Sequence, residues 1–279
     1  MAWIPVQVRS CGSAYFLGAD LPTCPAARAG VLSALGGPAV VVDRSPDPAV
    51  DVDCAAETGR ALAFPGDIVP GVGAFAVERG LIAVREAVTA VRVRMAGVVA
   101  VARVPTAPGR SGQSGPVLLR FPEPPGPPAD RIIGGVPVTL IDNGRTVVIA
   151  RAEEFGVTGF ETPTRLEYDH RLRHQVRRLL ATVGDRAELC LVAPSDAGDG
   201  LAVRVFAGDR VHPAIGVRTT LAVGAAAARP GTVVARIFTA RHRKLLRLEH
   251  PSGFLDVLPG ECPSVTATTR LVLDGRIPA

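Results

Sequence analysis

The sequence predicts an α+β fold made of two similar lobes, and three observations support this prediction. Short apolar strands make up most of the regular structure expected along the chain, with a few helices between them. Two helices rich in glycine and alanine, expected over about 69–79 and 217–228, each follow a strand and a loop. A proline-rich segment over 121–128 separates them as a stiff, extended connector. Each lobe is therefore expected to be a sheet wrapped around a central helix.

The expected lobes are residues 1–128 and 129–279, with the last strand a candidate to return to the first lobe. In the first lobe, apolar runs predict strands over 5–8, 15–17, 40–43 and 117–121. A hairpin is expected over 88–104, with Ala96 and Gly97 at its turn. The second lobe opens with strands over 136–141 and 146–149. Gly80 fits the end of the first helix, and Pro230 with Gly231 stops the other.

A third helix is expected over 164–183, where apolar residues recur with the period of a helix. The apolar positions that share one face are Leu172, Val176, Leu179, Leu180 and Val183. The arginines between them, Arg171, Arg173, Arg177 and Arg178, are interpreted as a solvated face rather than a binding patch.

Composition excludes several function classes. No apolar run reaches the roughly 18 residues of a membrane span, and the first residues lack the pattern of a secretion signal, so a cytoplasmic protein without membrane association is expected. The arginines are spread along the chain and aromatic residues are 4%, which argues against nucleic-acid binding. The five cysteines form no CxxC pair, so neither a zinc or other metal site nor a disulfide framework is expected. The expected partner is a small-molecule substrate, and a homodimer is left open.

Several stretches follow one another in a recognisable order. They are Arg9–Ser13 with Asp20–Pro22, Val72–Ala76 with Gly80–Ile82, Val138–Gly144, Gly156–Gly159, Gly216 to Thr232, and His250–Gly253. In this order they resemble the motifs of the PrpF-like 2-methylaconitate isomerase and 4-oxalomesaconate tautomerase family. The resemblance implies a fold of the diaminopimelate-epimerase type with the active site between two lobes. It also implies small di- or tricarboxylate substrates and a proton shift without a cofactor, in which a lysine and a cysteine serve.

The sequence departs from the family at those two residues. Aligned on Val72, the family cysteine falls at Pro65, and the family lysines fall at about Ala39 and Ala14. No other alignment restores them, because Lys244 is the only lysine of the chain. The chain is thus interpreted as a divergent member that lacks the catalytic lysine and cysteine.

Three functions remain open. The favoured hypothesis is a cyclisation or other intramolecular rearrangement, such as a 4+2-type pericyclic step, of a polyketide-like intermediate in secondary metabolism. Such a step needs shape and orientation more than a strong base. The alternative is a proton-shift isomerase of a small unsaturated di- or tricarboxylate with substitute acid–base residues. The third hypothesis is a non-catalytic binding or scaffold protein.

Four residues are candidates for the catalytic role. Asp67 stands at the expected start of a helix beside the lost cysteine position, where it also fits an N-cap. His212 and His250 could exchange a proton near neutral pH, although each also fits a hydrogen-bonding role in a loop. Cys11 follows Arg9, which would favour its thiolate, whereas a buried thiol is the alternative.

Substrate binding is expected near the starts of the two small-residue helices, whose free N–H groups attract an anion. The candidate residues are Arg9, Tyr15, Gly66, Gly216, Arg218, Thr219, Thr220 and Ser252.

Overall fold

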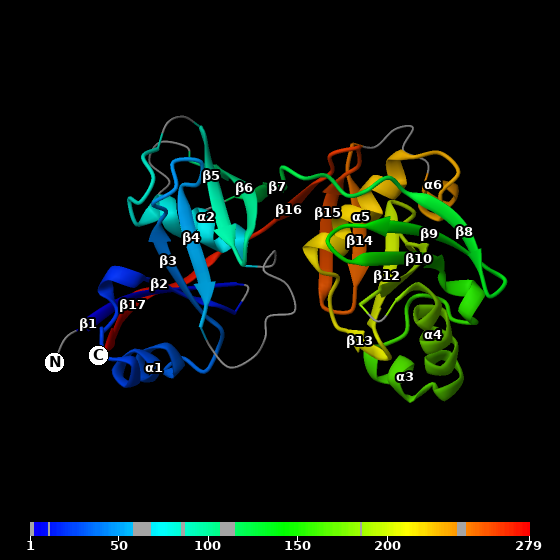
Figure 1. Cartoon of the computed structure of the whole chain (residues 1–279), viewed down its shortest axis with the longest axis horizontal. Helices are drawn as coiled ribbons and strands as arrows, with labels where there is room; N and C mark the ends of the chain where they lie inside the picture. Colours follow the sequence, from blue (N-terminus) through cyan, green and yellow to red (C-terminus); the bar gives the residue numbers. More distant parts are fainter. Residues whose placement is uncertain are drawn as a thin grey trace. The chain divides into compact units, whose positions relative to one another are not determined.

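The computed structural model describes residues 3–10, 12–57, 68–84, 87–106, 115–184, 186–238 and 244–279. The chain forms two compact units (Figure 1), one of residues 1–122 with 266–279 and one of residues 123–265. The first unit ends at residue 122, and the proline-rich segment belongs to the second unit from residue 123 onward.

In the first unit, each strand pairs with the strand before or after it in the sequence, and the last strand pairs with the first. Its strands are β1 (Trp3–Arg9), β2 (Ala14–Leu17), β3 (Ala39–Arg44), β4 (Val52–Ala56), β5 (Val88–Met95), β6 (Val98–Pro105), β7 (Val117–Arg120) and β17 (Leu271–Pro278). The β2–β3 and β4–β5 pairs are parallel, and the pairs β17–β1, β1–β2, β3–β4, β5–β6 and β6–β7 are antiparallel. The 3-10 helix η1 (Gly18–Asp20), α1 (Pro25–Ser33) and α2 (Val69–Glu78) complete the unit.

The predicted hairpin is confirmed. β5 and β6 pair antiparallel with Met95 opposite Val98. Ala96 and Gly97 both have positive φ, 49° and 79°, as a type I′ turn requires. The turn twists with the strands and fixes their register, so the small residues at these two positions determine the pairing.

The second unit is built on its own set of paired strands. Its strands are β8 (Ala129–Ile133), β9 (Val136–Asp142), β10 (Thr146–Arg151), β11 (Glu188–Pro194), β12 (Gly200–Ala207), β13 (Arg210–His212), β14 (Leu246–His250) and β15 (Gly253–Leu258). The pairs β10–β11 and β12–β14 are parallel, and the pairs β8–β9, β9–β10, β11–β12, β12–β13 and β14–β15 are antiparallel. Its helices are the 3-10 helix η3 (Ala152–Phe155), α3 (Pro163–Tyr168), α4 (His170–Val183), α5 (Val217–Ala228) and α6 (Val233–Ile237). The short strand β16 (Ser264–Ala267) lies where the chain leaves this unit.

Small residues let α2 and α5 approach their sheets closely. A Cβ placed on Gly73 of α2 would lie 2.7 Å from the Cβ of Ala102 in β6. A Cβ placed on Gly224 of α5 would lie 2.6 Å from a methyl group of Val257 in β15. Both distances are shorter than carbon atoms tolerate, so glycine is needed at each contact.

The prediction of one helix over 164–183 was wrong, because this stretch forms α3 and α4. The side chain of Thr162 caps α3 and that of Asp169 caps α4, with 2.9 Å from the Leu172 N–H to the Asp169 carboxylate. An aspartate that caps one helix adopts an extended backbone and so ends the helix before it. The apolar face is as predicted, since Leu172, Val176 and Leu179 lie in the core of the unit.

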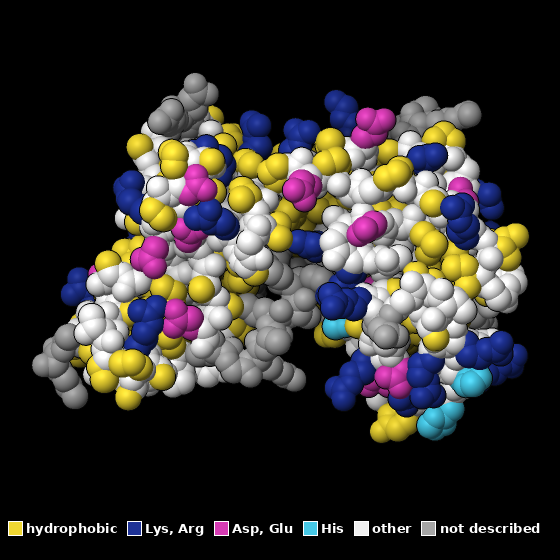
Figure 2. All heavy atoms as spheres, viewed as in Figure 1, with side chains coloured by type: hydrophobic (Ala, Val, Ile, Leu, Met, Phe, Trp, Pro, Cys, Tyr) yellow, Lys and Arg dark blue, Asp and Glu magenta, His cyan; other side chains and the backbone are white. Residues whose placement is uncertain are grey.

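The surface of both units is mixed in charge. Figure 2 shows arginine and acidic side chains interspersed on the visible face of each unit. No helix of the described residues is both long enough and apolar enough to cross a membrane.

Candidate functional site

The β13–α5 loop and the β14–β15 turn meet in the second unit at the carbonyl group of Pro213. Ser252 donates two hydrogen bonds to this oxygen, one from its N–H at 3.0 Å and one from its hydroxyl at 2.8 Å. The imidazole of His250 lies close enough to the same carbonyl for that oxygen to raise its pKa. His212, the last residue of β13, stands just before Pro213, and Gly216 follows three residues after it. Four of the predicted site residues are thus gathered in one place.

His250 has the properties of a proton acceptor. Its side chain is half-buried, and its Nδ1 atom is enclosed without a hydrogen-bond partner among the described residues. Burial lowers the pKa of His250 below its usual 6.5; the Pro213 carbonyl opposes this effect, and the Arg204 guanidinium adds to it. The lowered pKa favours the neutral imidazole at pH 7, the form that can accept a proton.

The start of α5 supplies hydrogen-bond donors beside this loop. Gly216 is the N-cap and no side chain caps the helix, so the N–H groups of its first turn have no side-chain acceptor. These groups carry partial positive charge and suit a carboxylate or a developing enolate oxygen. Gly216 thus contributes to the site through backbone geometry.

The side chains that follow Gly216 are engaged by the scaffold. Arg218 donates to the Asn143 carbonyl at 3.0 Å, and the Asn143 amide donates to the Arg218 carbonyl at 2.7 Å. The Thr220 hydroxyl donates to the Gly216 carbonyl at 3.0 Å. The Thr219 hydroxyl donates at 2.8 Å to Glu188, a buried carboxylate that also pairs with Arg145 in the turn between β9 and β10. The contacts of Arg218 and Thr219 fix α5 against the β9–β10 turn and β11.

Thr219→Val tests this anchoring role. The variant leaves one oxygen of the Glu188 carboxylate buried without its hydroxyl donor, and we expect it to lower the free energy of unfolding by about 1.5–3 kcal/mol. Chemical denaturation measures the loss. A variant with unchanged stability but weakened substrate binding would contradict anchoring and support direct contact with the substrate.

Arg9 and Tyr15 lie in the first unit and hold the two ends of α2. The Tyr15 hydroxyl donates at 3.2 Å to the carbonyl of Ile68, the residue before the helix. The fully buried Arg9 guanidinium pairs with Glu78, the last residue of α2, at 2.5 Å. Its Nε and Nη1 atoms have no hydrogen-bond partner among the residues that the structure describes. The other predicted site residues of this half, Cys11, Gly66 and Asp67, lie outside the described residues.

Two residues near the site were not singled out from the sequence. Arg204 of β12 is buried, its Nε and Nη1 donate to the carbonyls of Glu161 and Val203, and burial lowers its pKa. Glu188 begins β11. Each is one charged residue in an otherwise apolar strand, and that isolation is the signal that could have identified it.

Comparisons with known proteins identify the family. The family model described as "PrpF protein" matches residues 192–277. A (4E)-oxalomesaconate Delta-isomerase of Novosphingobium sp. (strain KA1) is 32% identical over 302 residues, covering 86% of this chain and 84% of the relative. A 4-oxalomesaconate tautomerase of Pseudomonas putida is 33% identical over 254 residues, covering 75% and 70%.

Solved structures confirm the predicted α+β fold of the diaminopimelate-epimerase type. A methylitaconate-delta-isomerase matches with a TM-score of 0.76 at 17% identity, covering 99% of this chain and 96% of that one. A hydroxyproline epimerase from Agrobacterium vitis matches with a TM-score of 0.56 at 15% identity, covering 99% and 91%. With relatives above 30% identity aligned along most of their length, the chain is an isomerase-class enzyme that belongs to the PrpF family.

Proposed function

We propose that the chain is a cofactor-independent isomerase that moves a proton within a small unsaturated carboxylic acid, with His250 as a proton-handling group. The observation that carries this proposal is the enclosed, unpartnered Nδ1 of His250 beside the uncapped start of α5. This is the hypothesis of a proton-shift isomerase with a substitute acid–base residue. It requires neither the lysine nor the cysteine that the family resemblance implies.

The chemistry follows from the two kinds of group in the loop. Neutral His250 takes a proton from a carbon next to the activating carbonyl or carboxylate, and the electron pair of that C–H bond moves into the conjugated system. The N–H groups at the start of α5 stabilise the negative charge that gathers on oxygen. Return of a proton at a carbon two bonds further along leaves the double bond shifted and the composition of the molecule unchanged.

The names of the relatives support a small carboxylate as the substrate. Two curated relatives are named for oxalomesaconate and one solved structure for methylitaconate, which gives two acids to test. We expect the chain to isomerise one of them in D2O and to place solvent deuterium on the carbon that gains the proton, as NMR would show. Absence of both turnover and exchange with either acid would contradict the proposal.

A cyclisation of a secondary-metabolite intermediate is the second candidate. One observation favours it: Lys244 is the only lysine, so the proton-transfer pair that the resemblance implies is missing. A 4+2-type pericyclic step breaks no C–H bond, so its product carries no solvent deuterium. Deuterium exchange therefore separates the two candidates directly.

A further inference from the structure

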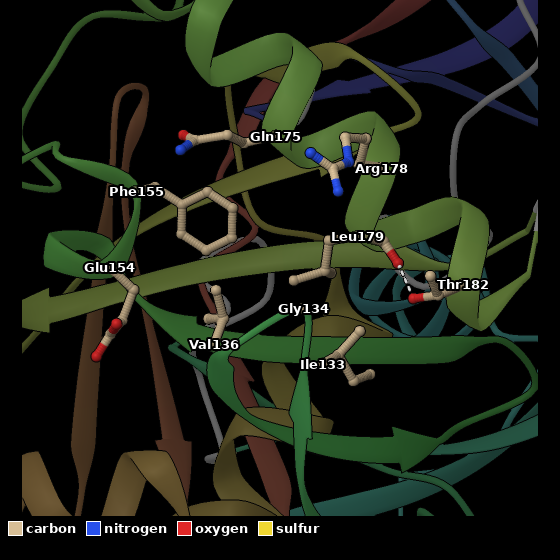
Figure 3. A pocket seen from close by; sticks show the side chains of 9 residues that line it. All are labelled: Ile133, Gly134, Val136, Glu154, Phe155, Gln175, Arg178, Leu179 and Thr182. Atoms are coloured by element: carbon tan, nitrogen blue, oxygen red, sulfur yellow. Dashed lines mark hydrogen bonds between the residues drawn. The ribbon is translucent and has the colours of Figure 1, made fainter.

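The second unit holds a cavity that is separate from the β13–α5 loop. It has a volume of about 230 Å3 and lies between the β8–β9 hairpin, η3 and α4 (Figure 3). Ile133, Val136, Phe155 and Leu179 form its apolar surface. An apolar cavity of about 150 Å3 in another protein accepts benzene, so this one has room for a single substituted ring.

Three polar side chains at this cavity have no partner within the described part of the chain. Gln175 and Arg178 project from α4, one helical turn apart, toward the space beside Phe155 and Leu179, and Glu154 stands on the other side (Figure 3). None of the three makes a side-chain hydrogen bond or an ion pair with the described residues. Arg173 of the same helix, by contrast, pairs with Asp209 at 2.5 Å. The guanidinium of Arg178 is thus left without a counter-ion of its own.

We propose that this cavity binds a small apolar monocarboxylate. The ring or branched chain of such a ligand would cover Phe155 and Leu179, and its carboxylate would form charge-assisted hydrogen bonds with Arg178. The Gln175 amide offers a further donor. Glu154 would repel a second carboxylate, so dicarboxylates are rejected. The ligand class therefore differs from the di- and tricarboxylates expected at the His250 site.

Benzoate is the probe, titrated into the full chain by isothermal calorimetry with ligand-observed NMR as a second readout. We expect benzoate to bind the wild type and phthalate, its dicarboxylate analogue, to bind at least about tenfold more weakly. Arg178→Gln should weaken benzoate binding about fivefold to tenfold, the effect of losing one partly exposed charge-assisted contact.

Arg177→Gln is the matched control, because it removes the same charge from the preceding residue of α4, which helps to lower the pKa of Asp209 and does not line the cavity. It should leave benzoate binding unchanged. The proposal would be overturned if Arg178→Gln bound benzoate as tightly as the wild type, or if both variants lost affinity. It would also be overturned if the wild type did not bind benzoate. Turnover at the His250 site is not used in this test, so its outcome is independent of the proposed function.

Discussion

Glu78→Gln is expected to lower the free energy of unfolding of the first unit by about 3 kcal/mol, because it leaves the Arg9 cation buried without a counter-charge. Arg9 has a side-chain exposure of 0% and Glu78 one of 15%. Within the described part of the chain, two of the three guanidinium nitrogens lack a hydrogen-bond partner, and the Glu78 carboxylate is the one acidic group paired with Arg9. We place the loss at the lower end of the range for buried pairs, since water still reaches Glu78.

Urea denaturation followed by the fluorescence of Trp3 measures this loss. Trp3 is the only tryptophan of the chain and lies in β1, so it reports on the first unit. Glu57→Gln is the matched control, since its partner Arg28 is 30% exposed and the loss of such a pair costs under about 1 kcal/mol.

A double variant separates charge from packing. Arg9→Met combined with Glu78→Gln removes the buried cation together with its counter-charge, and it should regain most of the stability that Glu78→Gln loses. If the single variant is as stable as the wild type, the Arg9–Glu78 pair does not compensate the buried cation as we infer. A double variant no better than the single one would point to lost packing as the cause.

His250→Asn is expected to lower kcat for the isomerised acid by about 100- to 10,000-fold, the usual contribution of a positioned acid–base group. The asparagine amide can still donate a hydrogen bond to the Pro213 carbonyl, so the loop should stay in place. Because the amide does not gain or lose a proton near neutral pH, proton transfer should be lost. Steady-state kinetics measures the loss, and circular dichroism checks the fold. His174→Asn, on the exposed face of α4, should retain full activity.

Retention of most of the activity in His250→Asn would remove His250 from the catalytic role. The same measurement on His212→Asn would then test the other histidine of the β13–α5 loop. We expect His212→Asn to change kcat less than His250→Asn, because His212 ends β13 in register with Val205 and shows no enclosed, unpartnered nitrogen.

The pH dependence of kcat/KM gives a third check. The neutral imidazole is the active form of a base, and burial holds the pKa of His250 below its usual 6.5. Activity should therefore be level above pH 7 and fall only as the pH drops through that lowered pKa, where the imidazole gains its proton. An acid limb with its midpoint above 6.5 would contradict His250 as the base.

Local patterns in the sequence predicted much of the fold. Glycine and alanine mark α2 and α5 as helices that lie close to a sheet, because no larger side chain fits at Gly73 or Gly224. Ala96 and Gly97 mark a tight hairpin because both need positive φ. The helix break at Asp169 was not predicted, although the hydrogen bond by which Asp169 caps α4 is local. The apolar residues of α4 continue the helical period of α3, so the two helices look like one in the sequence.

The site was predictable only in part. The sequence motifs drew attention to Gly216, His250 and Ser252, which the structure gathers around Pro213. They also suggested substrate-binding roles for Thr219 and Arg218, which the structure shows bonded to Glu188 and Asn143.

The sequence by itself determined the small-residue helices α2 and α5 and the hairpin at Ala96 and Gly97, because those choices depend on residues within a few positions of one another. Tertiary structure alone decided the partner of each polar side chain. Arg9 meets Glu78 across 69 positions and Asn143 meets Arg218 across 75, and no local pattern encodes such pairings. Whether a charged residue is free for a ligand depends on these distant contacts, which arise only when the chain has folded.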